Sequence, residues 1–130
     1  MAIKISHHWD LEVHKSSVNL AMLLFVSSKQ FPVEEKYSLT DQIRRSSRSV
    51  AAQISEAWRR RKYEAVFVNK LNEAEGEAAE TQTWIEFAVK CGYLQRPEGK
   101  SLHRQYERLL NQLANMGNHP EKWVLKRRNP

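Results

Sequence analysis

The side chains best suited to chemistry in this sequence are arginines that recur on one side of a predicted helix. At about 100° per residue, Arg44, Arg48 and Arg59 fall on one face. Five hydrophobic residues fall near the opposite side: Leu39, Ile43, Val50, Ile54 and Ala57. Such an array of positive charge is typical of a surface that binds phosphate groups or a partner's carboxylates. The candidate phosphate-binding residues are Arg44, Arg45, Arg48, Arg59, Arg60, Arg61 and Lys62, with Lys126, Arg127 and Arg128 near the carboxyl terminus.

No other pattern in the sequence favours catalysis or a tightly bound metal. Carboxylate-bridged metal bundles use Glu-x-x-His pairs, and this sequence contains none. The serines between the arginines have no His or acidic residue nearby in sequence, and there is no phosphate-cradling glycine loop. Glu73, Glu77 and Glu80 share one helical face and could hold a hard cation, but a solvated or inter-subunit acidic stripe is the interpretation we favour. We therefore expect no catalytic residue, no metal site and no cofactor, and predict that the protein is not an enzyme.

Length and composition narrow the class of protein. A chain of 130 residues is expected to form one domain, and its formal net charge of +6 permits a nucleic-acid or acidic partner without requiring one. Cys91 is the only cysteine, so no internal disulfide can form, which fits a reducing compartment. The longest hydrophobic run, residues 20–26, is too short to cross a bilayer, and the amino terminus lacks the apolar core of a signal peptide. We therefore expect a cytoplasmic protein without a membrane partner.

Hydrophobic periodicity predicts four helices, over residues of about 10–30, 38–60, 63–91 and 100–116. Asp10 is a potential cap for the first helix, whose apolar stripe includes Val18, Met22 and Phe25. The second helix is predicted to begin near Ser38 or Thr40. The segments between the helices are short.

Glycine and proline mark the predicted helix ends. Gly92 and Gly117 are expected to end the third and fourth helices, and the stretch Arg96–Gly99 is predicted to form a turn. For Gly76, in the middle of the third helix among alanines, we favour close helix packing as the explanation. The predicted fold is therefore an all-α, antiparallel up-and-down four-helix bundle over residues 1–117, followed by a basic tail, 118–130.

Charge is divided unequally between the second and third predicted helices. Residues 38–62 hold seven Lys or Arg against two acidic residues, a net of +5, whereas residues 63–91 hold two Lys against six Glu, a net of −4. These charges could pair inside one subunit, which charge alone slightly favours, or between subunits in a head-to-tail contact that can close into a ring. The candidate interface residues are Glu73, Glu77, Glu80, Trp58 and Trp84.

A family resemblance covers roughly residues 11–113. The segment FPVEEKYSLTDQIRRSSRSVAAQISEAW, followed by NEAEGEAAETQTW and CGYL, resembles the four-helix-bundle family of 23S ribosomal RNA intervening-sequence proteins. Its Phe-Pro, its acidic residue and its Leu-Thr-x-Gln-Ile-Arg-Arg segment correspond here to Phe31, Pro32, Glu35 and residues 39–45. The sequence departs from the family pattern where Gln53, Ala57 and Glu77 replace the usual Asn, Gly and Ser.

The resemblance implies a homopentamer of four-helix protomers, which favours the head-to-tail ring over pairing inside one subunit. A related bundle serves as an accessory protein to reverse transcriptases of diversity-generating retroelements, where a basic pentamer engages nucleic acid and the polymerase. By analogy we expect RNA or DNA, and also a protein, as partners.

Two hypotheses for the function remain open. In the first, the protein is a non-enzymatic oligomeric accessory protein whose arginines bind the phosphates of RNA or DNA. In the second, it is a structural interaction protein whose arginines bind the glutamates of a neighbouring subunit. The directions in which Arg44, Arg48 and Arg59 point distinguish the two.

Overall fold

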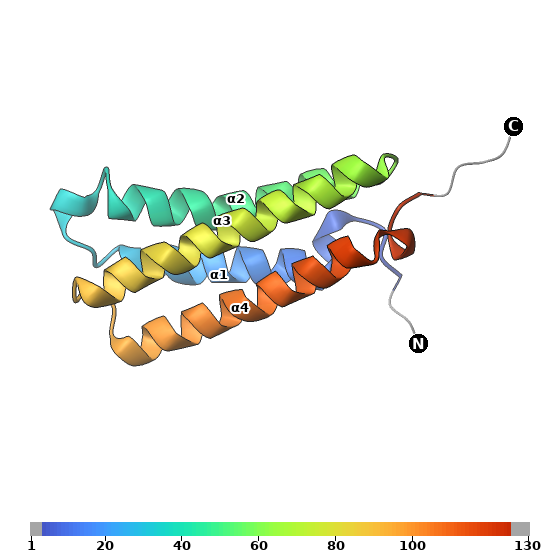
Figure 1. Ribbon diagram of the computed structural model, residues 1–130. Coiled ribbons are helices and arrows are strands. Elements are labelled where there is room, and N and C mark those ends of the chain that lie inside the picture. Colours follow the sequence, from blue (N-terminus) through green and yellow to red (C-terminus); the bar gives the residue numbers. More distant parts are fainter. Residues whose placement is uncertain (1–3, 126–130) are drawn as a thin grey trace, which may run out of the picture.

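The computed structural model describes residues 4–125 and consists mainly of four long helices that lie alongside one another in chain order (Figure 1). Their bounds are α1 (Glu12–Ser28), α2 (Leu39–Arg59), α3 (Glu64–Lys90) and α4 (Arg96–Asn118). Three short 3-10 helices accompany them, η1 (His8–Asp10), η2 (Val33–Glu35) and η3 (Pro120–Lys122). Successive helices run in opposite directions, so the all-α, up-and-down bundle predicted from the sequence is confirmed for the single chain.

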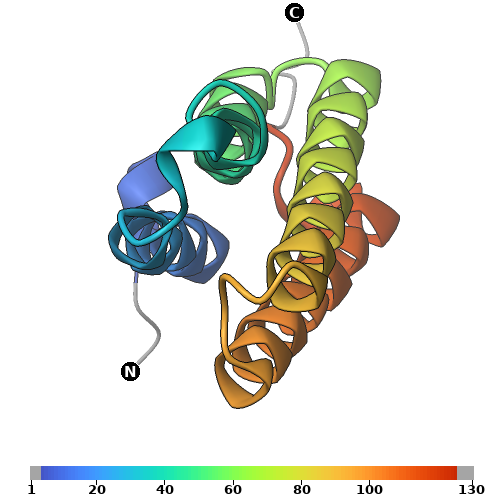
Figure 2. The ribbon, with the colours of Figure 1, turned by 90° about the vertical axis from the view of Figure 1, so that its left-hand side faces the viewer.

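Neighbouring helices in the sequence are also neighbours in space. The view along the bundle places α1 beside α2 on one side and α3 beside α4 on the other (Figure 2). The contacts of α2 with α3 and of α3 with α4 are the most extensive, and the bundle is closed by a smaller contact between α1 and α4. None of the helices in residues 4–125 is long and apolar enough to cross a membrane.

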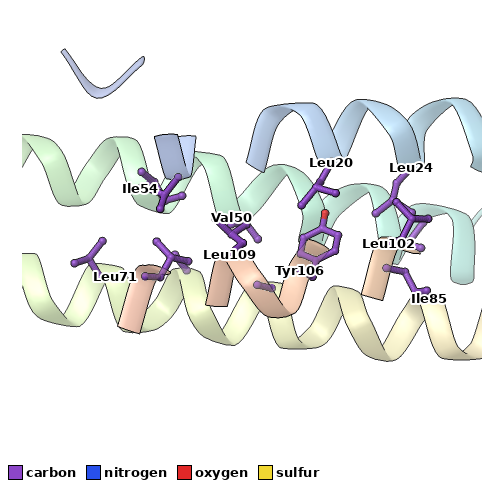
Figure 3. Packing of buried hydrophobic residues seen from close by; sticks show 14 of the residues in the cluster. Leu20, Leu24, Val50, Ile54, Leu71, Ile85, Leu102, Tyr106 and Leu109 are labelled. Atoms are coloured by element: carbon purple, nitrogen blue, oxygen red, sulfur yellow. The ribbon is translucent and has the colours of Figure 1, made fainter. Parts of the chain in front are cut away.

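The core is built from hydrophobic side chains of all four helices, mostly aliphatic, and Phe67 and Tyr106 are its largest fully buried residues. Leu20 and Leu24 from α1 meet Val50 from α2 and Leu109 from α4 in the centre of the bundle (Figure 3). Tyr106 is fully buried, and its hydroxyl points towards α1 near Leu20 without a hydrogen-bond partner among the described residues. Burial raises the pKa of this phenol, because the charged form would lie among hydrocarbon.

The third helix ends as the sequence predicts. Gly92 has φ of +82°, a conformation that L side chains adopt with difficulty. The Tyr93 N–H donates to the Ala88 carbonyl at 2.8 Å, and the Gly92 N–H donates to the Val89 carbonyl at 3.0 Å. This pair of hydrogen bonds is the Schellman motif, which satisfies carbonyls that the helix leaves free.

The start of α1 differs from the prediction that Asp10 caps it. The carboxylate of Asp10 instead accepts the backbone N–H groups of Ser6 and His7, both at 3.0 Å, and so closes the turn of η1. These backbone hydrogen bonds lower the pKa of Asp10. Leu11 occupies the N-cap position of α1 and makes no side-chain cap, because a leucine side chain has no hydrogen-bond acceptor.

The predicted turn at residues 96–99 is wrong, because α4 already begins at Arg96. Pro97 lies in the first turn of α4. Backbone N–H groups in the first turn have no partner within the helix, so the N–H that proline lacks costs no hydrogen bond there. Gly99 is buried against α3, where a Cβ would come within 2.3 Å of a methyl carbon of Val89. Gly117 does not end the helix either, since α4 continues to Asn118.

Part of the predicted tail lies against the bundle. After α4 the chain forms η3, and the half-buried Trp123 packs against the core. The Leu125 N–H then donates to the Arg61 carbonyl at 3.1 Å. The basic residues predicted for the end of this tail, Lys126, Arg127 and Arg128, lie outside the described residues.

Candidate nucleic-acid interface

Two of the predicted arginines are held over an aromatic ring between α1 and α2. The guanidinium carbons of Arg44 and Arg48 lie 4.9 and 5.7 Å from the centroid of the Phe25 ring, and the Lys29 ammonium lies 4.8 Å from it. Arg44 Nε also donates a hydrogen bond to Ser28 Oγ at 2.8 Å. Attraction to the face of the ring and this hydrogen bond restrict side chains that would otherwise sample many rotamers.

Arg44 and Arg48 line a surface hollow of about 460 Å³, which we call the basic hollow. Its lining consists of four cationic side chains, one carboxylate, one hydroxyl and one exposed aromatic ring: Lys36, Arg44, Arg45, Arg48, Asp41, Thr40 and Tyr37. The excess of cations over the single carboxylate makes the hollow a site of positive potential that attracts anionic groups.

The arginines of α2 are not neutralised by the acidic helix beside them. Within residues 4–125, no arginine lies within 4.0 Å of a carboxylate, and Lys70–Glu56 at 2.9 Å is the single ion pair between α2 and α3. In that pair the cation comes from α3 and the carboxylate from α2, the reverse of what the net charges suggest. Direct pairing inside one chain therefore does not explain the division of charge between these helices.

The remaining predicted cations, residues 59–62, lie at the far end of α2. Position 60 lies twelve residues beyond Arg48, or about 18 Å along the helix axis. Arg61 is used locally, since its guanidinium lies 3.4 Å from the Trp58 ring centroid and its Nε donates to the Trp58 carbonyl at 2.8 Å. Burial and the charge of Arg59 lower the pKa of this guanidinium. Arg59, Arg60 and Lys62 remain exposed, so the predicted phosphate-binding residues form two separate groups.

The predicted interface residues occupy different environments. Trp58 is 6% exposed and belongs to the core of its own chain, so little of its surface is left for another subunit. Trp84 is half-buried and lies 6.0 Å from the exposed Phe87 ring, and both line a second hollow between α2 and α3. The indole N–H of Trp84 has no hydrogen-bond partner in the described part of the chain.

The three predicted interface glutamates lie along α3. Glu73 accepts a hydrogen bond from Lys70 at 3.3 Å. Glu77 is half-buried, and its pKa is raised by desolvation and by the neighbouring Glu80, although the charge of Arg45 opposes this shift. No group of three or more His, Cys, Asp or Glu side chains suited to holding a metal ion occurs among residues 4–125.

Sequence reasoning missed the α1 half of this interface. Phe25, Val18 and Met22 were all assigned to the apolar stripe of α1, but Val18 and Met22 are exposed and Phe25 lies half-buried beneath the cations. The buried face of α1 instead contains Leu20 and Leu24 together with two serines. Because α1 is hydrophobic on almost every side, its periodicity cannot select a face. No sequence pattern predicted that Lys36 and Tyr37, just before α2, would line the hollow.

Comparison with known proteins agrees with the resemblance found in the sequence. Residues 9–115 match the family described as 23S rRNA-intervening sequence protein. Among solved structures, a protein with unknown function from the S23 ribosomal protein family of Bacteroides thetaiotaomicron has a TM-score of 0.74 and 30% sequence identity. That match covers 82% of this chain and 95% of the other. No significant match was found among curated proteins. Because the family match extends over most of the chain, this protein belongs to the 23S rRNA-intervening sequence protein family.

Proposed function

We propose that this protein is a non-enzymatic accessory protein that binds RNA or DNA through phosphate contacts. The observation that carries the proposal is the basic hollow, where Arg44 and Arg48 are oriented by Phe25 and have no carboxylate partner among residues 4–125. Guanidinium groups bind phosphate oxygens in a planar, two-point geometry. Such contacts position a nucleic acid without reading its bases, so binding is salt-sensitive and weakly sequence-specific.

The proposal includes a homopentameric ring assembled by head-to-tail contacts. The acidic stripe of Glu73, Glu77 and Glu80 lies on α3, and the second hollow lies between α3 and the start of α2, whereas the surplus of positive charge lies on α2. A contact between unlike surfaces propagates from one subunit to the next and closes when the rotation permits. A ring presents several basic hollows at once, and this multiplies contacts that are individually weak.

The rival function is a structural interaction protein in which the same arginines bind the glutamates of the next subunit. The half-buried Glu77 favours this alternative, because its pKa is raised by desolvation and a cation from another chain would relieve that penalty. In this case the basic hollow would be filled by protein, and the assembly would bind no nucleic acid.

Charge reversal in the basic hollow separates the two functions. The variant Arg44→Glu/Arg48→Glu is compared with Arg104→Glu/Arg108→Glu, which makes the same change of charge at exposed positions of α4. Mass is measured by light scattering, and binding of labelled RNA and DNA is measured across a salt series. We expect the first variant to lose binding at every salt concentration while it keeps the mass of the wild type, and the α4 variant to lose much less affinity.

The same experiment can overturn the proposal. If Arg44→Glu/Arg48→Glu dissociates the assembly, the arginines serve subunit contacts and the rival is correct. If the wild type binds neither RNA nor DNA at low salt, the nucleic-acid function is wrong whatever the mass. A binding constant that does not fall with salt would also contradict it, since each phosphate contact to a single strand contributes a slope of about −0.7 on the logarithmic plot.

A further inference from the structure

We infer that the basic hollow selects single-stranded nucleic acid, and that an unpaired base stacks on the ring of Tyr37 while Arg44 and Arg48 hold the flanking phosphates. This inference rests on the proposed function and names its substrate class. It is carried by the position of one exposed aromatic ring at the edge of a hollow that is otherwise lined by cations.

The ring of Tyr37 is available to a ligand. Its side chain is 84% exposed and makes no hydrogen bond to the described residues, and the nearest cation is Lys36 Nζ, 5.4 Å from the ring centroid. Phe25 cannot serve in this way, because it is half-buried and its ring already carries the guanidinium groups. Among the aromatic residues that the structure describes, Tyr37 is the one that lines the basic hollow.

The backbone that presents Tyr37 is fixed on both sides by Glu35. One carboxylate oxygen of Glu35 accepts hydrogen bonds from the Ser38 hydroxyl and from the Leu39 N–H, the latter at 3.3 Å. The other oxygen accepts the Tyr93 hydroxyl at 2.9 Å, which ties the segment to the end of α3. The Ser38 N–H also donates to the Glu35 carbonyl at 3.0 Å. The backbone that carries the Tyr37 ring is therefore held in place before a ligand arrives, which reduces the backbone entropy lost on binding.

A cationic groove beside an exposed aromatic ring is the combination that proteins use to bind single strands. The cations follow the phosphates, and each base offers a flat face to the ring whatever its sequence. In a duplex the base faces are already stacked on their neighbours, so a duplex can engage the arginines but cannot use Tyr37. Single strands should therefore gain a contact that is independent of salt.

The other exposed aromatic rings do not line the basic hollow. Tyr63 is 52% exposed and lies 5.8 Å from Lys62 Nζ, but it is at the far end of α2. Trp9 stacks on His7 with ring centroids 4.1 Å apart. The η1 helix that contains Trp9 lies at the other end of the bundle from the start of α2 (Figure 1). Phe87 lines the second hollow with Trp84, which we assign to subunit contacts. Tyr37 also borders that second hollow, so the test must follow the assembly state as well as the affinity.

The test compares three substitutions of Tyr37 that leave the charge unchanged. Tyr37→Phe keeps the flat ring, Tyr37→Leu keeps apolar bulk without it, and Tyr37→Ala removes both. Each variant and the wild type are titrated against a labelled uridine oligonucleotide and against an RNA duplex of equal length, with mass measured in parallel. A uridine oligonucleotide containing 5-bromouridine is also irradiated, and the crosslinked residue is identified by mass spectrometry.

We expect Tyr37→Ala and Tyr37→Leu to weaken single-strand binding by about 5- to 150-fold, the effect of losing one stacked base. Tyr37→Phe should bind like the wild type, duplex affinity should be the same in all four proteins, and the salt slope and the mass should not change. The crosslink should fall on Tyr37. Substitution of Arg44 and Arg48 should instead lower affinity for single strand and duplex alike.

Three results overturn the inference, and each has a different meaning. If all four proteins bind the single strand and the duplex equally, the stacking role is wrong and the phosphate-binding function stands. If none binds an oligonucleotide but all bind poly-glutamate, both the inference and the proposed function are wrong, and the basic hollow serves an acidic protein. A change of mass in Tyr37→Ala would assign the ring to a subunit contact.

Discussion

At the residue scale, two glycines in helices have opposite surroundings. Gly76 in α3 is exposed, and a Cβ built there would contact nothing within 4 Å, so the close packing expected from its alanine neighbours is wrong. Gly99 in α4 is buried, and its missing Cβ lets α4 approach Val89 of α3. Helix packing therefore requires glycine at position 99, whereas no packing contact requires it at position 76.

These surroundings predict opposite effects of alanine. Gly76→Ala should raise the free energy of unfolding by about 0.5–1 kcal/mol, because alanine loses less backbone entropy in a helix. Gly99→Ala should lower it, since overpacking costs roughly 1–3 kcal/mol and exceeds the gain in helix propensity. Denaturant unfolding of both variants beside the wild type measures the difference. Equal stabilisation by the two substitutions would show that α3 and α4 can separate without penalty at Val89.

At the scale of elements, the segment between α1 and α2 is organised by one carboxylate. Glu35 accepts hydrogen bonds from Ser38, Leu39 and Tyr93, and these bonds lower its pKa. The same contact raises the pKa of Tyr93 to about 12, because a charged phenolate would face the carboxylate. Phe31 lies against the Tyr93 ring with centroids 5.6 Å apart, so the segment is attached to α3 by both an apolar and a polar contact.

The shifted pKa of Glu35 gives this segment a defined dependence on pH. Because the folded pKa lies below the ordinary value of 4.5, the stabilising contribution is complete above that value and is lost as the pH falls through the folded pKa. Tyr93→Phe removes one donor and should raise the pKa of Glu35 towards its ordinary value. A carboxyl NMR titration measures this shift, with Tyr63→Phe as the control. An unchanged pKa in Tyr93→Phe would show that the hydroxyl does not hold the segment.

At the scale of the whole molecule, the unpaired charge of α2 and α3 bears on assembly. Neither the arginines of the basic hollow nor the Glu77–Glu80 pair is neutralised by direct ion pairs inside residues 4–125. An assembly that joins unlike surfaces would bring such charges closer together, and one that leaves the basic hollow open would still bind phosphates. The proposed function requires that the acidic stripe of α3 takes part in the subunit contact and that the basic hollow stays outside it.

Charge reversal on α3 should therefore act on the mass of the assembly directly, and on nucleic-acid binding only through the loss of the assembly. Glu77→Lys/Glu80→Lys should dissociate the assembly, because it places cations where the next subunit presents positive charge. Glu12→Lys/Glu121→Lys, which makes the same change of charge at exposed positions elsewhere, should keep the mass of the wild type. Light scattering over a range of protein concentrations measures both. If both variants retain the wild-type mass, the acidic stripe is not part of the interface.

The four helices, the end of α3 at Gly92 and the amphipathic character of α2 could all be predicted from the sequence. These features depend on residue spacing along one helix and on local backbone preferences, and both can be derived from the sequence without knowing how the helices pack. The family could be recognised for the same reason, because its most specific motif lies within residues 31–60.

The buried face of α1 and the surroundings of the α2 arginines depend instead on how the helices pack, so they could not be predicted from the sequence. A helix that is hydrophobic on most sides can be rotated about its axis with little change in burial, so neighbouring helices select the face. That selection brought Phe25 beneath Arg44 and Arg48 and left the glutamates of α3 without arginine partners. The position of Tyr37 beside them depends on hydrogen bonds that the Glu35 carboxylate accepts from residues as distant as Tyr93, which spacing along the chain cannot reveal.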